Sequence, residues 1–255
     1  MKKFSSLLVV LLLMLASFTA GMEYQRGDVD QDGQVGISDV TCLIDYLLSG
    51  TWPEDPVTPP DDHEYVDLGL PSGTLWATCN VGANAPEDYG DYFAWGETEP
   101  KDYYDWSTYI WCNGDYETMT KYCIDSKYGT VDNKTELEPE DDAAYVNWGP
   151  SWRIPSNEQL NELIENCTWS WTASNGVNGY QVTGPNGSTL FWPAVGNCIG
   201  DWISNEGTDG RYWSRTLCLE YSYGAYYLYF RSGGNSGSSS RSYGRTVRAV
   251  RVPQN

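Results

Sequence analysis

The C-terminal part of the chain contains two apolar and aromatic runs separated by a polar segment. The first run covers residues 225–230 and the second covers residues 246–252. In a strand over the first run, Tyr226, Leu228 and Phe230 would share one face, because alternate side chains of a strand point the same way. The pattern therefore predicts two strands in this region.

The segment between the two runs, residues 232–244, is built from Arg, Ser, Gly, Asn and Tyr and has no apolar anchor. Loops of this length inside a domain are usually functional or disordered. Binding loops use the same residue types, with Tyr giving rigid contact area, Ser, Gly and Asn adaptable hydrogen bonds, and Arg charged anchors. We therefore expect a ligand surface in the loop region 212–248. Its expected contact residues are Arg215, Tyr221, Tyr223, Arg231, Asn235, Arg241 and Tyr243.

The composition favours strands and loops over helices. Aromatic residues make up 15% of the chain, with 12 Trp and 20 Tyr, and Gly and Ser are frequent. One helix is clearly marked, because Pro155 prevents an earlier start and Ser156 and Gln159 form a capping box. Its core-facing residues are expected to be Leu160, Leu163 and Ile164. We therefore predict an α+β fold of short strands and long loops.

The charge is strongly negative but unevenly distributed. A formal net charge of −20 argues against general nucleic-acid binding. Seven Arg nevertheless follow residue 210, where Glu220 is the only acid. Arg245, Arg248 and Arg251 lie in or beside a predicted strand, so ion pairs with the acidic body and ligand contacts both stay open for them.

The first 21 residues have the pattern of a secretory signal. Lys2 and Lys3 precede an apolar run at residues 7–15, which is too short to span a bilayer, and small residues follow at 17–21. We expect a secreted protein, in the periplasm, at the cell surface or outside the cell, with no membrane span after signal removal.

The seven Cys of an exported chain permit disulfides. Proximity in sequence makes Cys112–Cys123 and Cys198–Cys218 the plausible pairs. The odd count leaves one thiol over, and Cys42 is the expected one.

A small module at residues 22–50 carries the acidic spacing of a calcium loop. Three Asp occupy positions 1, 3 and 5 of a twelve-residue loop, and Gly33 supplies the sharp turn at position 6. The tight loop turns alternate carboxylates inward, where they converge on one hard cation. The expected Ca²⁺ ligands are Asp28, Asp30, Asp32, the Gln34 carbonyl and Asp39.

This calcium loop and the apolar helix predicted after it resemble one repeat of a dockerin, a module that attaches proteins to cohesin-bearing assemblies. Dockerins normally carry two such repeats, and the chain has one. The resemblance implies a cohesin-like partner. The single repeat leaves two other arrangements open, namely docking on the main domain or pairing with a second copy.

A Pro-rich acidic linker at residues 51–63 follows the module, and Pro residues in such a linker favour extended backbone. It ends at His63, the only histidine, which we expect to be solvated. A single His argues against His-assisted Ser or Cys hydrolysis and against a multi-His metal site.

The main domain is predicted to cover residues 64–253. Five of its segments resemble the Fibrobacter succinogenes major paralogous domain, namely VDLGLPSGTLWATCNVGA, YGDYFAWGETEP, WGPSWRIPSNEQLNEL, YWSRTL and GRTVRAVRV. The resemblance implies a C-type-lectin-like fold in which the first strand, residues 65–70, pairs with the last, residues 246–252. The acidic group at residues 136–142 fits no metal loop, and a solvated loop is expected there.

Two functions are compatible with these features. The first is a non-enzymatic adhesin or receptor that binds a protein or glycan through region 212–248. This region also resembles variable proteins diversified by retroelements, with YWSRT in place of Y-W-S-S-T. The alternative is a carbohydrate-binding or polysaccharide-degrading component attached through the dockerin-like module. Glu97, beside Trp95, is the first candidate carboxylate for hydrolysis, although a packing role is favoured.

If the single dockerin-like repeat mediates self-pairing, Ca²⁺ should increase the molar mass of the full chain in solution. Light scattering with Ca²⁺ and with a chelator tests this. A monomer under both conditions would remove the self-pairing hypothesis.

Overall fold

The computed structural model describes residues 40, 43–44, 63–231 and 234–251. The chain divides into two units, Met1–Pro60 and Asp61–Asn255. The predicted signal at 1–21, the linker at 51–62 and the calcium ligands lie outside the described residues. Export and calcium binding therefore stay predictions. Within the first unit, Val40 and Ile44 are helical and exposed.

The second unit is mostly β, with four small antiparallel sheets among the residues the structure describes. The first, in the order β1-β2-β12-β3, comprises β1 (Tyr65–Asp67), β2 (Leu75–Ala77), β12 (Val250–Arg251) and β3 (Trp152–Arg153). The second, in the order β11-β10-β9, comprises β11 (Gly234–Ser240), β10 (Gly224–Phe230) and β9 (Gly210–Leu217). The third consists of β4 (Thr168–Ser174), β5 (Val177–Thr183) and β6 (Thr189–Pro193). The fourth pairs β7 (Asn197–Ile199) with β8 (Trp202–Ser204). The helices are η1 (Pro139–Asp141), α3 (Ala143–Trp148) and α4 (Asn157–Asn166).

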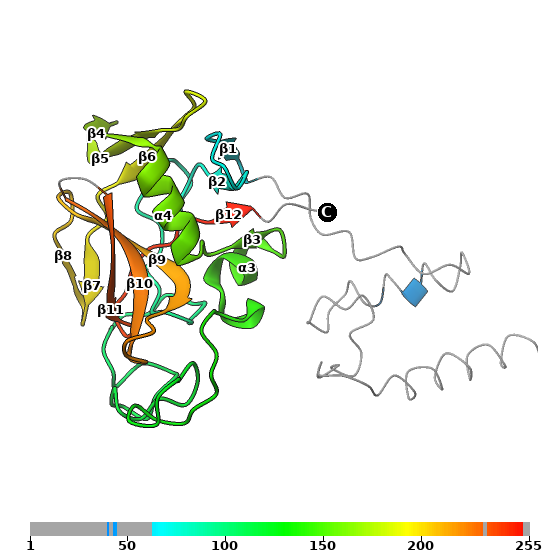
Figure 1. Cartoon of the computed structure of the whole chain (residues 1–255), viewed down its shortest axis with the longest axis vertical. Helices are drawn as coiled ribbons and strands as arrows, with labels where there is room; N and C mark the ends of the chain where they lie inside the picture. Colours follow the sequence, from blue (N-terminus) through cyan, green and yellow to red (C-terminus); the bar gives the residue numbers. More distant parts are fainter. Residues whose placement is uncertain (1–39, 41–42, 45–62, 232–233, 252–255) are drawn as a thin grey trace, which may run out of the picture. The chain divides into compact units, whose positions relative to one another are not determined.

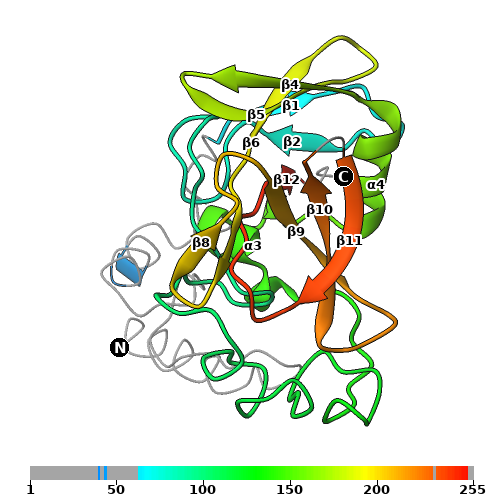
Figure 2. The same ribbon diagram turned by 90° about the vertical axis from the view of Figure 1, so that its left-hand side faces the viewer.

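The sheets are arranged around the β9–β11 sheet. Helix α4 packs against this sheet, and the β4–β6 sheet lies at one end of the unit (Figure 1). Part of the long connection between β2 and η1 forms the opposite end (Figure 1). The β7–β8 hairpin lies beside the β9–β11 sheet (Figure 2).

Helix α4 confirms the helix predicted from the capping box. Ser156 accepts a hydrogen bond from the Gln159 backbone N–H, and the Gln159 side chain accepts one from the Ser156 N–H. Leu160 and Leu163 are fully buried, and Ile164 packs against the same core cluster. This helix can be predicted from the sequence because its capping residues and its apolar stripe lie within ten residues of one another.

The β10–β11 hairpin confirms one predicted strand and corrects the predicted loop. Leu228 and Phe230 of β10 are buried in the core, as the alternation predicts. Residues 234–240, however, form β11, which pairs with β10 from Gly224↔Ser240 to Phe230↔Gly234. Pairing joins backbone groups, so a Ser- and Gly-rich segment of low strand propensity can still be a strand beside an apolar partner.

The last strand joins the sheet of the first strand but is not its neighbour. Strand β12 pairs with β2 through Val250↔Trp76 and with β3 through Val250↔Arg153. Strand β1 pairs with the other side of β2. The expected direct pairing of residues 65–70 with 246–252 is therefore wrong, since β2 lies between the two strands.

The two expected disulfides are not formed. The six cysteines in the described residues, Cys42 being outside them, are free thiols. Cys112 Sγ lies 3.3 Å from the Trp106 carbonyl oxygen, and Cys123 Sγ lies 3.2 Å from that of Asp125. Cys198 Sγ lies 3.8 Å from the carbonyl oxygen of Gly200. These thiols donate to nearby backbone carbonyls instead of bonding to one another.

The acidic segment 136–142 is structural and is not the expected solvated loop. Asp142 is buried and caps α3, where its carboxylate accepts backbone N–H groups of Ala144 and Tyr145. It also accepts the N–H of Ile154 next to β3 at 3.0 Å. One carboxylate therefore joins the start of α3 to the segment that leads into α4.

We predict that Asp142 makes the stability of the domain fall as the pH rises from about 4 to 6. Burial raises the pKa of Asp142 to about 6, against the opposing effect of the Ile154 N–H. The unfolded value is about 3.9, so the folded state binds this proton more tightly. Ionisation above pH 6 should therefore cost about 2–3 kcal/mol of unfolding free energy.

The measurement is urea unfolding from pH 4 to 7 for wild type, for Asp142→Asn and for the exposed control Asp102→Asn. The Asp142→Asn protein should lose this pH slope, whereas the control should keep it. Parallel pH profiles for all three proteins would contradict the assignment.

Candidate functional site

The β7–β8 hairpin presents an exposed aromatic side chain on a rigid support. Its two strands are joined by Gly200 and Asp201, and Gly200 has a φ of +63°, which glycine adopts without strain. Backbone hydrogen bonds between Gly200 and Tyr104, 2.8 and 2.9 Å long, hold the turn to a neighbouring loop. Equivalent bonds join Cys198 to Gly244. The hairpin is therefore fixed at its tip and along its length.

Trp202, the first residue of β8, is 71% exposed. Its cross-strand partner Ile199 is also exposed. Tyr103 is exposed too, and its ring lies beside Gly200. Large apolar side chains grouped at one place on a surface commonly mark an interaction site. The hairpin tip therefore has the properties of a contact platform.

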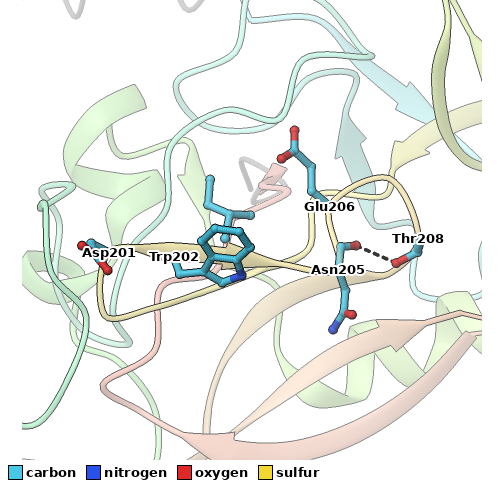
Figure 3. A pocket seen from close by; sticks show the side chains of 6 residues that line it. Asp201, Trp202, Asn205, Glu206 and Thr208 are labelled. Carbon is cyan, nitrogen blue, oxygen red and sulfur yellow. Dashed lines mark hydrogen bonds between the residues drawn. The ribbon is translucent and has the colours of Figure 1, made fainter.

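An open hollow of about 610 Å³ lies beside Trp202. Figure 3 shows the six side chains around it, and they are Asp201, Trp202, Ile203, Asn205, Glu206 and Thr208. Four of the six are polar, with acceptors on Asp201, Glu206 and Thr208 and both donors and acceptors on the Asn205 amide. A surface of this kind suits a polar ligand that has one apolar face. We name it the Trp202 hollow.

The wall of the Trp202 hollow is shaped by a tight turn between β8 and β9. The Asn205 carbonyl accepts hydrogen bonds from the Thr208 hydroxyl and from the N–H groups of Thr208 and Asp209. The Gly207 N–H donates to the carbonyl of Ala194 at 2.8 Å. The backbone of the turn is therefore anchored to the body of the domain, and the Thr208 side chain is held in place before a ligand arrives.

Arg231 is the residue from the expected contact set that lies next to this wall. Its side chain is 67% exposed, and its Nε is 3.6 Å from a carboxylate oxygen of Asp209, the residue after Thr208. Asn235 pairs with Tyr229 through β11, and its side chain lies outside the described residues. Tyr243 is half-buried.

Tyr221 and Tyr223 lie at the other end of β10. Their rings stack at 4.6 Å, and Tyr223 also packs edge-to-face on Tyr116 and Tyr128. A seven-residue strand such as β10 spans roughly 20–25 Å. One small ligand therefore cannot contact both these tyrosines and Arg231.

Two of the expected contact residues, Arg215 and Arg241, use their side chains for contacts within the domain. Arg215 pairs with Glu136 and donates to the Ile154 carbonyl at 3.0 Å, so it supports the start of α4. Arg241 is fully buried, which contradicts its expected role as a ligand contact. Its nitrogens donate to the hydroxyl of Tyr109 and to three backbone carbonyls, those of Lys121, Tyr122 and Ser222.

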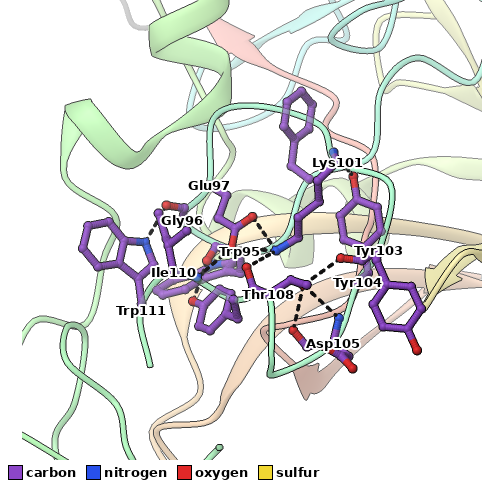
Figure 4. Close-up of polar contacts among 12 residues, drawn as sticks. Trp95, Gly96, Glu97, Lys101, Tyr103, Tyr104, Asp105, Thr108, Ile110 and Trp111 are labelled. Carbon is purple, nitrogen blue, oxygen red and sulfur yellow. Dashed lines mark hydrogen bonds and ion pairs between the residues drawn. The ribbon is translucent and has the colours of Figure 1, made fainter. Parts of the chain in front are cut away.

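Glu97 is almost fully buried at 6% exposed. Its carboxylate pairs with Lys101 at 2.7 Å and accepts the Ile110 N–H at 3.0 Å (Figure 4). Lys101 in turn donates to the Thr108 carbonyl at 3.0 Å. Through these contacts to Lys101 and Ile110, Glu97 holds the loop between residues 97 and 110 in place.

His63 is not solvated as expected, because its ring stacks on Trp148 with centroids 4.0 Å apart. The two residues line a second hollow of about 410 Å³ together with Cys79 and Asn84. Within the described ranges, no three His, Cys, Asp or Glu side chains are grouped to hold a metal ion. No helix in the same ranges is long and apolar enough to cross a membrane.

Comparisons with protein-family models, with curated proteins and with solved structures find no match to this chain. The Trp202 hollow lies outside the ligand region expected from the sequence, because its residues lie upstream of region 212–248. The available signal was Gly200-Asp201 between two short apolar runs, since Gly-Asp is typical of a two-residue hairpin turn.

We predict that Arg241→Ala destabilises the domain by about 3–5 kcal/mol, because it leaves four buried acceptors without their donor and opens a cavity. The exposed control Arg231→Ala should change the stability by about 0.5 kcal/mol or less. Urea unfolding of both variants measures the difference. Equal losses would contradict a structural role for Arg241.

Proposed function

We propose that this chain is an exported carbohydrate-binding protein of C-type-lectin-like fold and that its ligand site is the Trp202 hollow. The observation that carries the proposal is a Trp ring, 71% exposed on a fixed hairpin, beside a hollow lined mainly by polar side chains. The strand-rich α+β architecture, with both ends of the domain in one sheet, supports the fold assignment.

The chemistry of a sugar ring matches this surface. One face of a pyranose presents C–H groups, which pack favourably on the electron-rich face of an indole. Its hydroxyls need both donors and acceptors. Asp201 and Glu206 accept, as does the Thr208 hydroxyl, whose own hydrogen is donated to the backbone carbonyl of Asn205, whereas the Asn205 amide donates as well as accepts. Because the hollow is open, it suits a chain end or an internal stretch of a polysaccharide.

A protein ligand in region 212–248 is the second candidate. Arg231 favours it, because this exposed Arg extends the polar surface from the Trp202 hollow onto β10. Retroelement diversification of the region remains a hypothesis for that case. In either case we propose that the calcium module attaches the domain to a cohesin-like partner or to another copy.

We predict that Trp202→Ala weakens oligosaccharide binding at least about tenfold, because the stacking surface is removed. The control is Trp171→Ala, which removes a Trp that is 45% exposed on β4. The control should bind as wild type does. Calorimetry with oligosaccharides from plant and host polysaccharides, chosen by an initial array screen, measures both variants.

Equal affinities for wild type and Trp202→Ala would contradict the proposed site. Release of shortened sugars during the same incubations would contradict a binding-only function. Binding that is lost in Arg231→Ala and kept in Trp202→Ala would favour the second candidate.

A further inference from the structure

The C-terminal segment buries three arginines, and they differ in how their nitrogens are satisfied. Arg241, Arg245 and Arg248 are all fully buried. Each guanidinium nitrogen of Arg241 donates to a protein oxygen. In Arg248, Nε donates to Asn80 and Nη1 to two backbone carbonyls, whereas Nη2 has no hydrogen-bond partner. The fold can therefore supply acceptors to a buried guanidinium.

Arg245 departs from this pattern. Its Nε donates to Asn197 Oδ1 at 2.9 Å, but neither Nη1 nor Nη2 has a protein acceptor. The guanidinium carbon lies 3.6 Å from the centre of the Tyr227 ring and 4.3 Å from that of Trp213. These aromatic faces attract the cation but accept no ordinary in-plane hydrogen bond.

The Asn197 amide adds one more donor beside Arg245. Its Nδ2 has no protein partner, although its oxygen binds Arg245. Nε of Arg211 also has none, but Arg211 lies on the Tyr229 ring and pairs with Asp209, whose Oδ1 is a buried acceptor without a hydrogen bond. The unsatisfied groups of Arg245 and Asn197 are therefore donors, and the unsatisfied acceptor belongs to the carboxylate that pairs with Arg211.

The charge at this place is uncompensated as well. Burial, together with repulsion from Arg211, lowers the pKa of Arg245 to about 9, while Tyr227 and Tyr243 act in the other direction. Among the described residues, no carboxylate forms an ion pair with Arg245. A buried charge is normally paired with an opposite charge, because the low-dielectric interior solvates it poorly.

We propose that Nη1 and Nη2 of Arg245, together with Nδ2 of Asn197, bind a small inorganic anion of the chloride class between β7 and the β9–β11 sheet. A water molecule would also have to donate its own two hydrogens, and the unsatisfied groups of Arg245 and Asn197 are donors only. An anion needs donors alone and supplies the missing negative charge. The atoms are enclosed, so the ion is small.

The site stands apart from the proposed sugar site and does not depend on it. Its expected role is structural, since Asn197 belongs to the hairpin that carries Trp202, whereas Tyr227 and Trp213 belong to the β9–β11 sheet. A bound anion would hold these two elements together.

The test is thermal unfolding of the full chain in chloride, with gluconate replacing chloride at constant ionic strength. Each tenfold increase in chloride above the dissociation constant should raise the Tm by roughly 3–5 °C. Asn197→Asp places a carboxylate beside Arg245 and should abolish the chloride dependence without lowering the Tm in gluconate. Arg231→Ala, which removes an exposed cation, should keep the dependence.

Crystals grown in bromide give a second readout. An anomalous peak within hydrogen-bond distance of the Arg245 Nη atoms is expected. A Tm that does not respond to chloride, with an ordered water in this position, would overturn the proposal. Equal chloride dependence in wild type and Asn197→Asp would also overturn it, because the effect would then arise elsewhere.

Discussion

The fold depends on burial of the arginine-bearing segment that precedes and enters the last strand. Arg241 binds the carbonyls of a loop at residues 121–122, and Arg248 binds those of residues 77–78 beside β2. Between them, Arg245 joins Asn197 of β7 to the aromatic face of the β9–β11 sheet. Three planar cations thus connect the C-terminal segment to a distant loop, to β2 and to β7. A change in this segment should therefore affect the whole domain.

This use of the C-terminal arginines determines where a ligand can bind. Arg241, Arg245 and Arg248 are buried inside the domain, so the Arg-rich sequence does not by itself make a cationic surface. Arg231, at the end of β10, is exposed. It lies near the turn that shapes the Trp202 hollow. The surface most suited to a ligand therefore lies on the β7–β8 hairpin and the turn after it, with Arg231 beside that turn.

What the sequence predicts correctly here is local. Helix α4 was predicted because Ser156 and Gln159 form a cap within four residues, and β10 because its side chains alternate. The role of Arg241 could not be predicted, because its acceptors at Lys121 and Tyr122 are about 120 positions away in the chain. Strand β11 was missed because its partner, and not its own Ser and Gly residues, determines its conformation. The exposure of Trp202 follows from tertiary packing, which no local pattern encodes.

The central claim is that the Trp202 hollow is the ligand site, and a chemical-shift map tests it most directly. The indole N–H signal of Trp202 is assigned in ¹H–¹⁵N spectra by its loss in Trp202→Phe, and an oligosaccharide selected by the array is then titrated into wild type. We predict shifts of this signal and of the backbone amides of residues 201–208, with little change at Trp171. Shifts confined to Tyr221, Tyr223 and β10, with the Trp202 signal unmoved, would contradict the account.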